Sequence, residues 1–209
     1  MNIYSVFRSI QGEGLMIGTP TVFIRTSGCS LRCTYCDTPQ AFDKGEELSN
    51  DDIVERVQTY RTRDVCLTGG EPLAQKDSLK LIQKLLDIGH TVVVETSGAM
   101  PLDEMPCDGN LSICMDIKCP SSGEEGKMMY DNIELLGPTD QLKFVISDGA
   151  DYEFAKRVID EYAPKCEVIL TPVGGKDMKE LAEKVLEDGL QGRVLPQLHK
   201  LIWGDEDDR

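Results

Sequence analysis

Three cysteines stand close together in the segment Gly28-Cys29-Ser30-Leu31-Arg32-Cys33-Thr34-Tyr35-Cys36-Asp37-Thr38-Pro39, at the spacing CxxxCxxC. A disulfide would use two of the sulfur atoms and leave the third over, whereas three thiolates can converge on one metal centre. Structural zinc sites and iron–sulfur clusters usually take four protein ligands. A second cysteine pair at comparable spacing does not appear. The segment therefore predicts a three-cysteine metal centre with one position open to a ligand from outside the protein.

This cysteine spacing resembles the signature of the radical S-adenosylmethionine (SAM) superfamily, and the aromatic Tyr35 just before the third cysteine makes the resemblance closer. An iron left open by the protein is what an enzyme needs if its cofactor must bind the cluster directly. A three-cysteine zinc site completed by a distant His or Asp stays as the alternative, although the specificity of the motif favours a cluster.

Composition limits the class of protein. A chain of 209 residues, 40% of them hydrophobic, suits one domain with a real core. No apolar run is long enough to span a bilayer, and residues 1–5 lack the features of a signal peptide. The net charge of −15 argues against a nucleic-acid partner. With clustered rather than scattered cysteines, we expect a cytoplasmic protein without membrane or nucleic-acid partners.

The other five cysteines are predicted to be structural. Cys66, Cys114 and Cys166 lie in or beside apolar runs, as buried core thiols do. Cys107, Cys114 and Cys119 are separated by six and four intervening residues, which matches no metal-binding template. We expect these positions to be core or loop cysteines.

Apolar strands alternate with amphipathic helices along the chain, which is typical of a parallel sheet covered by helices. The predicted helices begin near 50, 77, 151 and 177 and end near 60, 86, 162 and 188. The predicted strands span residues 3–7, 21–26, 64–67, 91–94, 111–115, 142–146 and 168–170.

Polar residues follow nearly every predicted strand, and in barrel enzymes the active site is assembled from several such strand ends. No GxGxxG follows the first strand, which argues against an open dinucleotide-binding sheet. A complete eight-unit barrel needs about 250 residues. The predicted fold is therefore α/β, a partial (β/α)6-like barrel of radical SAM type, formed as a single domain by residues 1–204. Residues 205–209 are predicted to be an acidic, disordered tail.

Four further positions are candidates for ligand binding. The segment Thr68-Gly69-Gly70-Glu71-Pro72 combines close backbone approach with a carboxylate that can accept from the ammonium group of SAM. Asp116 and Lys118 alternate to the same side of a strand, where they can pair with each other or bind SAM. The Thr38 hydroxyl suits Mg2+, which needs few protein ligands. Arg25, at the end of an apolar strand, faces either solvent or an anion.

Six segments together resemble the family of 7-carboxy-7-deazaguanine synthases, and the match extends over almost the whole chain. The specific part is Gln11-Gly12-Glu13-Gly14 upstream of CxxxCxxC-Asp-Thr. The segments span residues 9–14, 18–39, 68–72, 95–98, 143–145 and 196–200.

The resemblance implies a set of site residues. Cys29, Cys33 and Cys36 would hold a 4Fe-4S cluster, and Thr38 would bind Mg2+. Substrate contacts would come from Ile10, Gln11, Gly12, Glu13, Arg25, Thr68 and His199. SAM contacts would come from Tyr35, Cys36, Asp37, Gly70, Glu71, Asp116, Ile117, Lys118, Thr171, Pro172, Val173 and Gly174. Some family members end soon after the His-Lys motif and bind substrate with the chain terminus. This chain continues past it, so no terminal contact is assigned.

The resemblance also implies the reaction. Reductive cleavage of SAM would give a 5'-deoxyadenosyl radical that removes hydrogen from 6-carboxy-5,6,7,8-tetrahydropterin. Ring contraction and loss of ammonia would then give 7-carboxy-7-deazaguanine, on the path to queuosine or archaeosine, with SAM regenerated. It further implies a homodimer and a one-electron donor such as flavodoxin or ferredoxin. Two alternatives are a glycyl-radical-activating SAM enzyme and, more remotely, an iron–sulfur electron carrier, which would need a fourth cysteine.

Overall fold

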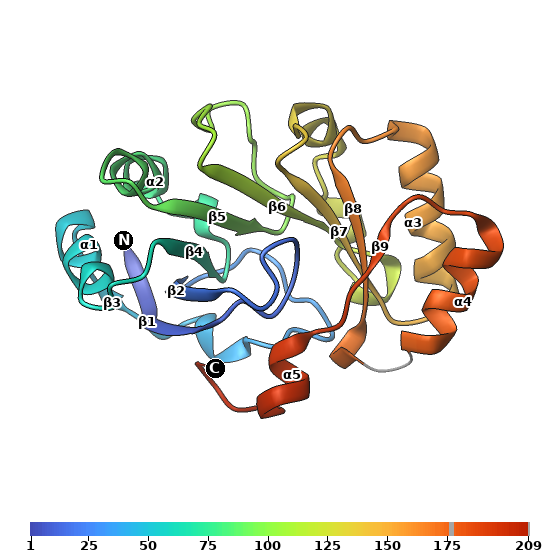
Figure 1. The fold of residues 1–209 in the computed structure, drawn as a ribbon, viewed down its shortest axis with the longest axis horizontal. Coiled ribbons are helices and arrows are strands. Elements are labelled where there is room, and N and C mark those ends of the chain that lie inside the picture. Colours follow the sequence, from blue (N-terminus) through green and yellow to red (C-terminus); the bar gives the residue numbers. More distant parts are fainter. Residues whose placement is uncertain (176–177, 209) are drawn as a thin grey trace.

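The computed structural model describes residues 1–175 and 178–208 (Figure 1). Within those residues the strands form one nine-stranded sheet in the order β3-β1-β2-β4-β5-β6-β7-β8-β9. The strands β2, β4, β5, β6, β7, β8 and β9 pair in parallel with their neighbours in this order. At one edge, β1 pairs antiparallel with both β2 and β3. Their bounds are Asn2–Ile10 (β1), Pro20–Thr26 (β2), Glu46–Glu47 (β3), Asp64–Gly69 (β4), Thr91–Thr96 (β5), Leu111–Ile117 (β6), Gln141–Ile146 (β7), Glu167–Pro172 (β8) and Arg193–Val194 (β9).

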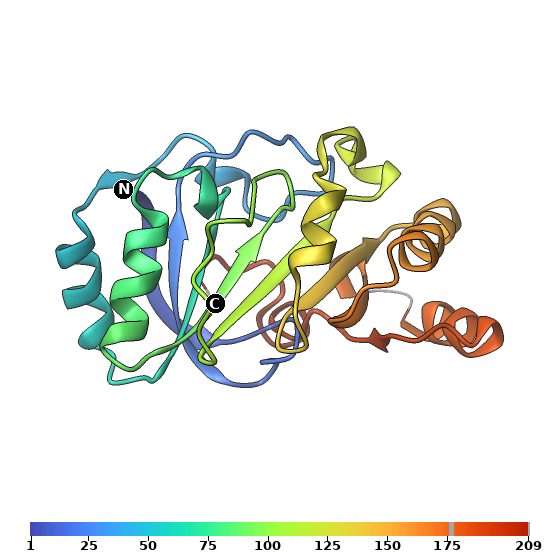
Figure 2. The same ribbon diagram turned by 90° about the horizontal axis from the view of Figure 1, so that it is seen from above.

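The sheet curves without closing, which confirms the predicted partial barrel (Figure 2). Six strands of six or more residues run parallel (β2, β4, β5, β6, β7 and β8), in agreement with the predicted number of units. The first strand is longer than predicted and continues through Ile10, so it carries the chain to the loop at Gln11. The two-residue strands β3 and β9 were not predicted, because so short a pairing leaves no periodic pattern in a sequence.

Helices cover the convex side of the sheet (Figure 2). They are α1 (Asn50–Gln58), α2 (Ser78–Asp87), α3 (Gly149–Tyr162) and α4 (Met178–Asp188), whereas the short α5 (Leu198–Trp203) lies away from them, below the sheet in Figure 1. The first four confirm the predicted helices, although the predicted start of the last at Asp177 lies outside the described residues. Helix α1 begins in a capping box, in which the Ser49 hydroxyl accepts from Asp52 N and the Asp52 carboxylate accepts from Ser49 N.

Two connections of the barrel lack an α-helix. The chain between β5 and β6 runs as a loop, and the chain between β6 and β7 forms only 3-10 turns (Pro120–Ser122, Glu125–Lys127, Tyr130–Leu135). Pro101 and Pro106 in the first connection and Pro120 in the second interrupt helical hydrogen bonding. The cysteine loop rests on the second connection.

The core consists of two apolar clusters between sheet and helices. Leu81, Ile82 and Leu85 of α2 pack with Leu67 of β4 and Val94 of β5, all fully buried. A second cluster joins α3 to β7 and β8. Burial of each large aliphatic side chain contributes about 1.5–3 kcal/mol to stability. This packing holds the strands rigidly, so the residues at their ends keep fixed positions.

The cysteines outside the CxxxCxxC segment are mainly structural. Cys66, Cys114 and Cys119 are buried, as expected for core thiols, and Cys107 is exposed on a loop. Cys166 is only partly buried, so its assignment to the core interior is wrong, although it packs against the second apolar cluster. No described helix is long and apolar enough to cross a membrane.

The acidic end of the chain, predicted to be a disordered tail, lies against the rest of the protein at residues 207 and 208. Asp207 accepts hydrogen bonds from Tyr4 Oη at 2.8 Å and from Gln40 Nε2 at 2.8 Å. Asp208 accepts one from Ser5 Oγ at 2.9 Å. The acidic side chains find donors on β1 and beside the cysteine loop, which composition alone did not reveal. Arg209 lies outside the described residues.

Candidate active site

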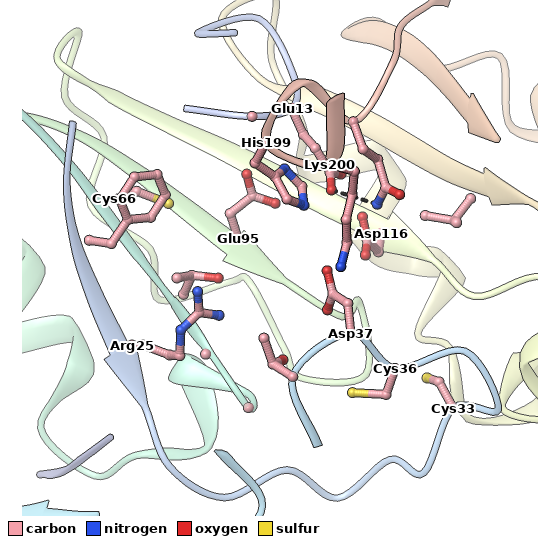
Figure 3. A pocket seen from close by; sticks show the side chains of 18 of the residues that line it. Glu13, Arg25, Cys33, Cys36, Asp37, Cys66, Glu95, Asp116, His199 and Lys200 are labelled. Atoms are coloured by element: carbon pink, nitrogen blue, oxygen red, sulfur yellow. Dashed lines mark hydrogen bonds between the residues drawn. The ribbon is translucent and has the colours of Figure 1, made fainter. Parts of the chain in front are cut away.

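A cavity of about 470 Å³ opens at the carboxyl ends of the parallel strands (Figure 3). Arg25 of β2 and Thr68 of β4 are neighbours in the strand register and both line it. Glu95 of β5, Asp116 of β6 and Lys143 of β7 add charged groups from the next strands. The loop after β1 and helix α5 complete the wall. Because parallel strands present their carboxyl ends at one edge, residues far apart in the chain meet here.

The cysteine loop lies along one side of this cavity, and polar contacts fix its backbone. Arg32 Nη1 donates to Cys29 O and to Leu31 O, both at 2.7 Å. Arg32 N donates to Glu124 Oε1 at 2.6 Å, and the Thr34 hydroxyl donates to Ser121 O at 2.6 Å. The loop is therefore tied to the connection after β6.

The three cysteines of this loop suit an iron–sulfur cluster. Cys29, Cys33 and Cys36 are unpaired, partly exposed and line the cavity. Burial raises the pKa of the Cys29 and Cys33 thiols, so they are protonated in the free protein and must lose protons to bind a metal.

The Gly-Gly-Glu segment after β4 docks directly on the cysteine loop. Glu71 N donates to Gly28 O at 2.8 Å, and Gly70 N donates to Thr26 O at 3.0 Å. A Cβ at position 70 would lie 2.0 Å from Gly28 O, so only glycine permits this contact. The Gly-Gly-Glu segment and the cysteine loop therefore lie in contact through their backbones.

Glu71 itself has a different role from the predicted one. Its side chain is fully buried and accepts hydrogen bonds from Leu73 N at 3.0 Å, Ser97 N at 2.8 Å and Thr96 Oγ1 at 2.9 Å. The carboxylate thus joins β5 to the loop after β4, and it does not line the cavity. These bonds give Glu71 a structural role, and its predicted contact with the SAM ammonium stays a prediction.

Lys143 lies at the centre of a buried charged network. Its Nζ is 2.7 Å from Glu13 Oε2, 3.2 Å from Glu95 Oε2 and 3.1 Å from Asp116 Oδ1. Lys118 Nζ pairs with Asp116 Oδ2 at 2.6 Å, so the two predicted strand neighbours do form an ion pair. With two lysines against three carboxylates, the network is richer in acidic than in basic groups.

The surroundings shift the pKa values of the three carboxyl groups in different directions. Burial opposes ionisation of Asp116 and Glu13, but Lys118 and Lys143 outweigh it at Asp116, and Lys143 outweighs it at Glu13. The pKa values of both groups therefore lie below their usual range. Burial raises the pKa of Glu95, because Lys143 offsets it only in part. Glu95 is thus the member of the network that most readily keeps a proton.

Helix α5 brings His199 to the same cavity, beside Glu13 and Asp37 (Figure 3). These three residues offer ligand atoms that all lie within 4.8 Å of one another. Burial lowers the pKa of His199, so its imidazole is neutral near pH 7. Leu198 N donates to Gly12 O at 2.8 Å, and Gln197 Nε2 donates to Glu13 Oε1 at 2.9 Å. The helix is therefore anchored to the loop after β1.

All seven predicted substrate contacts line the cavity, as do the three cysteines and Thr38. Most predicted SAM contacts line it too: Tyr35, Cys36, Asp37, Gly70, Asp116, Lys118, Val173 and Gly174. Besides Glu71, three predicted SAM contacts (Ile117, Thr171 and Pro172) have buried side chains and do not line it. Ile117 belongs to an apolar core cluster, and Thr171 and Pro172 are buried at the end of β8, so contact of these three residues with a cofactor stays a prediction.

Glu95 and Lys143 were not predicted as site residues. Both are single charged groups within or at the end of apolar strands, Val92-Val93-Val94-Glu95 and Leu142-Lys143-Phe144. A charge buried on a strand needs a partner of opposite charge. A single charged residue in an apolar strand could therefore have indicated these two positions as site residues.

Comparisons with known proteins agree with this site. Residues 23–108 match the model of the radical SAM superfamily. A 7-carboxy-7-deazaguanine synthase of Methanospirillum hungatei is 42% identical, with 97% of this chain and 85% of the relative covered. One of Thermoplasma acidophilum is 37% identical, with 98% of each covered. The crystal structure of QueE from Escherichia coli matches with a TM-score of 0.75 at 24% identity, over 93% of both chains.

Proposed function

The chain belongs to the family of 7-carboxy-7-deazaguanine synthases, radical SAM lyases of deazapurine biosynthesis, and we propose that its substrate is 6-carboxy-5,6,7,8-tetrahydropterin, converted with loss of ammonia. The observation that carries the proposal is the position of Arg25 in one cavity with the cysteine loop and the Lys143 network. Membership of this family argues against the two alternative functions, a glycyl-radical-activating enzyme and an iron–sulfur electron carrier.

Family membership implies a 4Fe-4S cluster and SAM, and the cavity has residues that fit them. Cys29, Cys33 and Cys36 would hold the cluster, with the backbone of Gly70 beside them and Tyr35 on the cavity wall. When bound, the cluster and SAM together would supply radical chemistry for abstraction of hydrogen from the substrate.

The chain's own residues would bind and orient the pterin. Arg25, at the end of β2, suits the substrate carboxylate, because a guanidinium offers paired donors to such a group. The pyrimidine half of a pterin presents several N–H donors and a carbonyl, which match the carboxyl and amide groups of Glu13, Glu95 and Gln11. The Gln11 Nε2 lies 3.4 Å from Glu95 Oε1, so these groups face one space.

Glu95 has the further capacity to hold a proton near the reacting ring. Its raised pKa makes it the carboxyl group best suited to release a proton to a departing amine. Lys143 would position Glu95 through their 3.2 Å contact.

We further propose Mg2+ at Thr38. Thr38 precedes a short 3-10 helix (Pro39–Ala41), but its hydroxyl makes no capping hydrogen bond there. The hydroxyl therefore stays available on the cavity wall, where a cation would share substrate oxygens. Adding a chelator of divalent cations to the assay that contains Mg2+ should abolish product formation, and excess Mg2+ should restore it.

The partner and location predictions also stay proposals. We propose a homodimer and a flavodoxin- or ferredoxin-like electron donor in the cytoplasm. Exposed apolar side chains on α5, Leu201 and Ile202, offer a surface that a dimer contact would cover. Light scattering of the purified protein tests the first proposal.

The decisive experiment for function is a product assay. Protein reconstituted without oxygen is incubated with reductant, SAM, Mg2+ and the carboxypterin, and the products are analysed by mass spectrometry. We expect 7-carboxy-7-deazaguanine. Formation of 5'-deoxyadenosine without that product would disprove the substrate assignment while leaving the radical SAM chemistry intact.

A further inference from the structure

The acidic segment 205–208, called here the tail, runs along the cavity that holds Arg25. All four tail residues line the cavity. Asp208 Oδ1 lies 3.5 Å from Arg25 Nε, and the two side chains are 33% and 14% exposed. A carboxylate of the chain itself thus reaches the guanidinium that we assign to the substrate carboxylate.

The tail is held in this position by several weak contacts rather than by packing. Tyr4, Ser5 and Gln40 each donate one hydrogen bond to Asp207 or Asp208. The tail residues are exposed or only partly buried, in contrast to the fully buried strands beneath them. Exposed contacts of this kind contribute little each, so the tail can leave its position at modest cost.

Arg25 is an incompletely satisfied partner for the tail. Its Nε is buried and makes no hydrogen bond with the described residues. The 3.5 Å between this atom and Asp208 Oδ1 allows an ion pair but is longer than an ordinary hydrogen bond. Arg25 is also fixed in place, since its guanidinium stacks on Phe7 with 5.4 Å between Cζ and the ring centroid. A ligand carboxylate with paired hydrogen bonds would satisfy Arg25 better than Asp208 does.

The chain provides a pivot for tail movement. Gly204 ends α5 with a φ of +65°, and a Cβ at this position would meet nothing within 4 Å. Rotation at this open glycine would move the tail and break the exposed contact between Lys200 Nζ and Asp205 Oδ1 (2.8 Å), while α5 stays anchored through Leu198 and Gln197.

We propose that the tail aspartates are an internal competitor for the Arg25 anion site, displaced when a carboxylated ligand binds. The inference rests on the proposed function, because it takes the substrate carboxylate as the displacing group. The apparent dissociation constant of such a ligand is then raised in proportion to the fraction of protein whose tail is closed. A ligand of the same shape without a carboxylate does not compete for Arg25.

The test compares the wild type with Asp207→Asn/Asp208→Asn, a double variant that removes both charges and keeps side-chain size. Binding of 6-carboxypterin and of pterin, which lacks the carboxylate, is measured by calorimetry on the SAM-loaded holoprotein without oxygen. We expect the double variant to bind 6-carboxypterin about two- to fivefold more tightly, as loss of one weak, partly exposed ion pair allows, with pterin binding unchanged. The matched control, Asp103→Asn/Glu104→Gln, removes two exposed charges outside the cavity lining and should bind like the wild type.

The other outcomes would overturn the inference in distinguishable ways. Unchanged or weaker binding of 6-carboxypterin by the double variant would show that the tail does not compete. Equal tightening for both pterins would mean steric obstruction, and tightening in the control would mean a general charge effect. If no protein binds either pterin and the wild type forms no product, the proposed substrate fails and the inference fails with it.

Discussion

Lys143 Nζ on β7 lies 2.7 Å from Glu13 Oε2 in the loop after β1, although the two residues are 130 positions apart in the chain. This contact joins the antiparallel edge of the sheet to its parallel centre. Glu13 also accepts from Gln197 at 2.9 Å, so the same carboxylate links β7, the first loop and the segment before α5. One ion pair thereby holds three separate parts of the cavity wall.

Replacement of Lys143 by methionine should strongly destabilise the protein. The change leaves Glu13, Glu95 and Asp116 close together without their shared cation, and removing one partner of a buried ion pair costs about 3–5 kcal/mol. Urea denaturation at pH 7 measures the loss. The control is Lys184→Met, whose partner Glu180 is largely exposed, and it should change stability by about 1 kcal/mol or less. Equal effects of the two variants would show that the network is not coupled to folding.

The strands and the cysteine loop could be predicted from the sequence because local patterns define both. Continuous apolar runs between polar residues identify parallel strands, and the CxxxCxxC spacing identifies its own chemistry. The charged network could not be predicted in this way. The sequence shows that Lys143 lies among apolar neighbours, but its three partners come from other elements. Asp116 is its register partner on β6, Glu95 lies on β5, and Glu13 lies in the loop after β1, so the strand order and the path of this loop bring them together.

The tail makes contacts that its composition did not predict. An acidic run without apolar residues is typical of disorder, because it cannot bury a core. Here the tail meets Arg25, Tyr4 and Gln40, which supply specific charge and hydrogen-bond partners. Order in such a segment depends on the surface it meets, and that surface is distant in sequence.

Gly70→Ala should separate the two loops that form the cofactor side of the cavity. The new Cβ would lie 2.0 Å from Gly28 O, and because that atom is backbone, a loop must move. We expect a loss of about 1–3 kcal/mol in stability and weaker SAM binding to the reconstituted protein. Calorimetric titration with SAM measures the second effect. Gly109→Ala serves as control, because its Cβ would meet nothing within 4 Å, and wild-type-like behaviour of both variants would contradict the proposed contact.

Asp116 should contribute a stability that is lost in acid. Its pKa in the folded protein is below the usual range of an aspartate, since burial is outweighed by Lys118 and Lys143. A carboxyl group with a lowered folded pKa stabilises above its unfolded pKa, and this stability disappears as the pH falls through the folded pKa. Glu95, whose pKa is raised, acts in the opposite direction, because its contribution is lost as the pH rises.

The measurement is urea denaturation of wild type and Asp116→Asn between pH 5 and pH 3. We expect the wild type to lose stability over this interval more steeply than the variant, which cannot titrate at this position. Identical slopes would mean that Asp116 has an ordinary pKa.

Cys33→Ser should prevent assembly of a complete cluster, because a serine hydroxyl replaces one of three thiolate ligands. Iron content and the visible absorption spectrum after reconstitution measure the effect, and we expect both to fall clearly below the wild-type values. Cys107→Ser is the matched control, since Cys107 is exposed and outside the cavity lining. A similar loss of iron in the control would show that reconstitution, rather than ligation, had failed.

Arg25→Gln should weaken binding of the carboxylated substrate and leave the fold intact. The side chain lies at the cavity edge and is stacked on Phe7, so its neutral replacement removes paired, charge-assisted hydrogen bonds to a carboxylate without opening the core. Such bonds contribute about 1.5–3 kcal/mol, which corresponds to a rise in KM of roughly ten- to a hundredfold. Steady-state assays on reconstituted protein measure KM and kcat, and the exposed Arg157→Gln on α3 should match the wild type. A fall in kcat with KM unchanged would place Arg25 in the chemical step instead of in carboxylate binding.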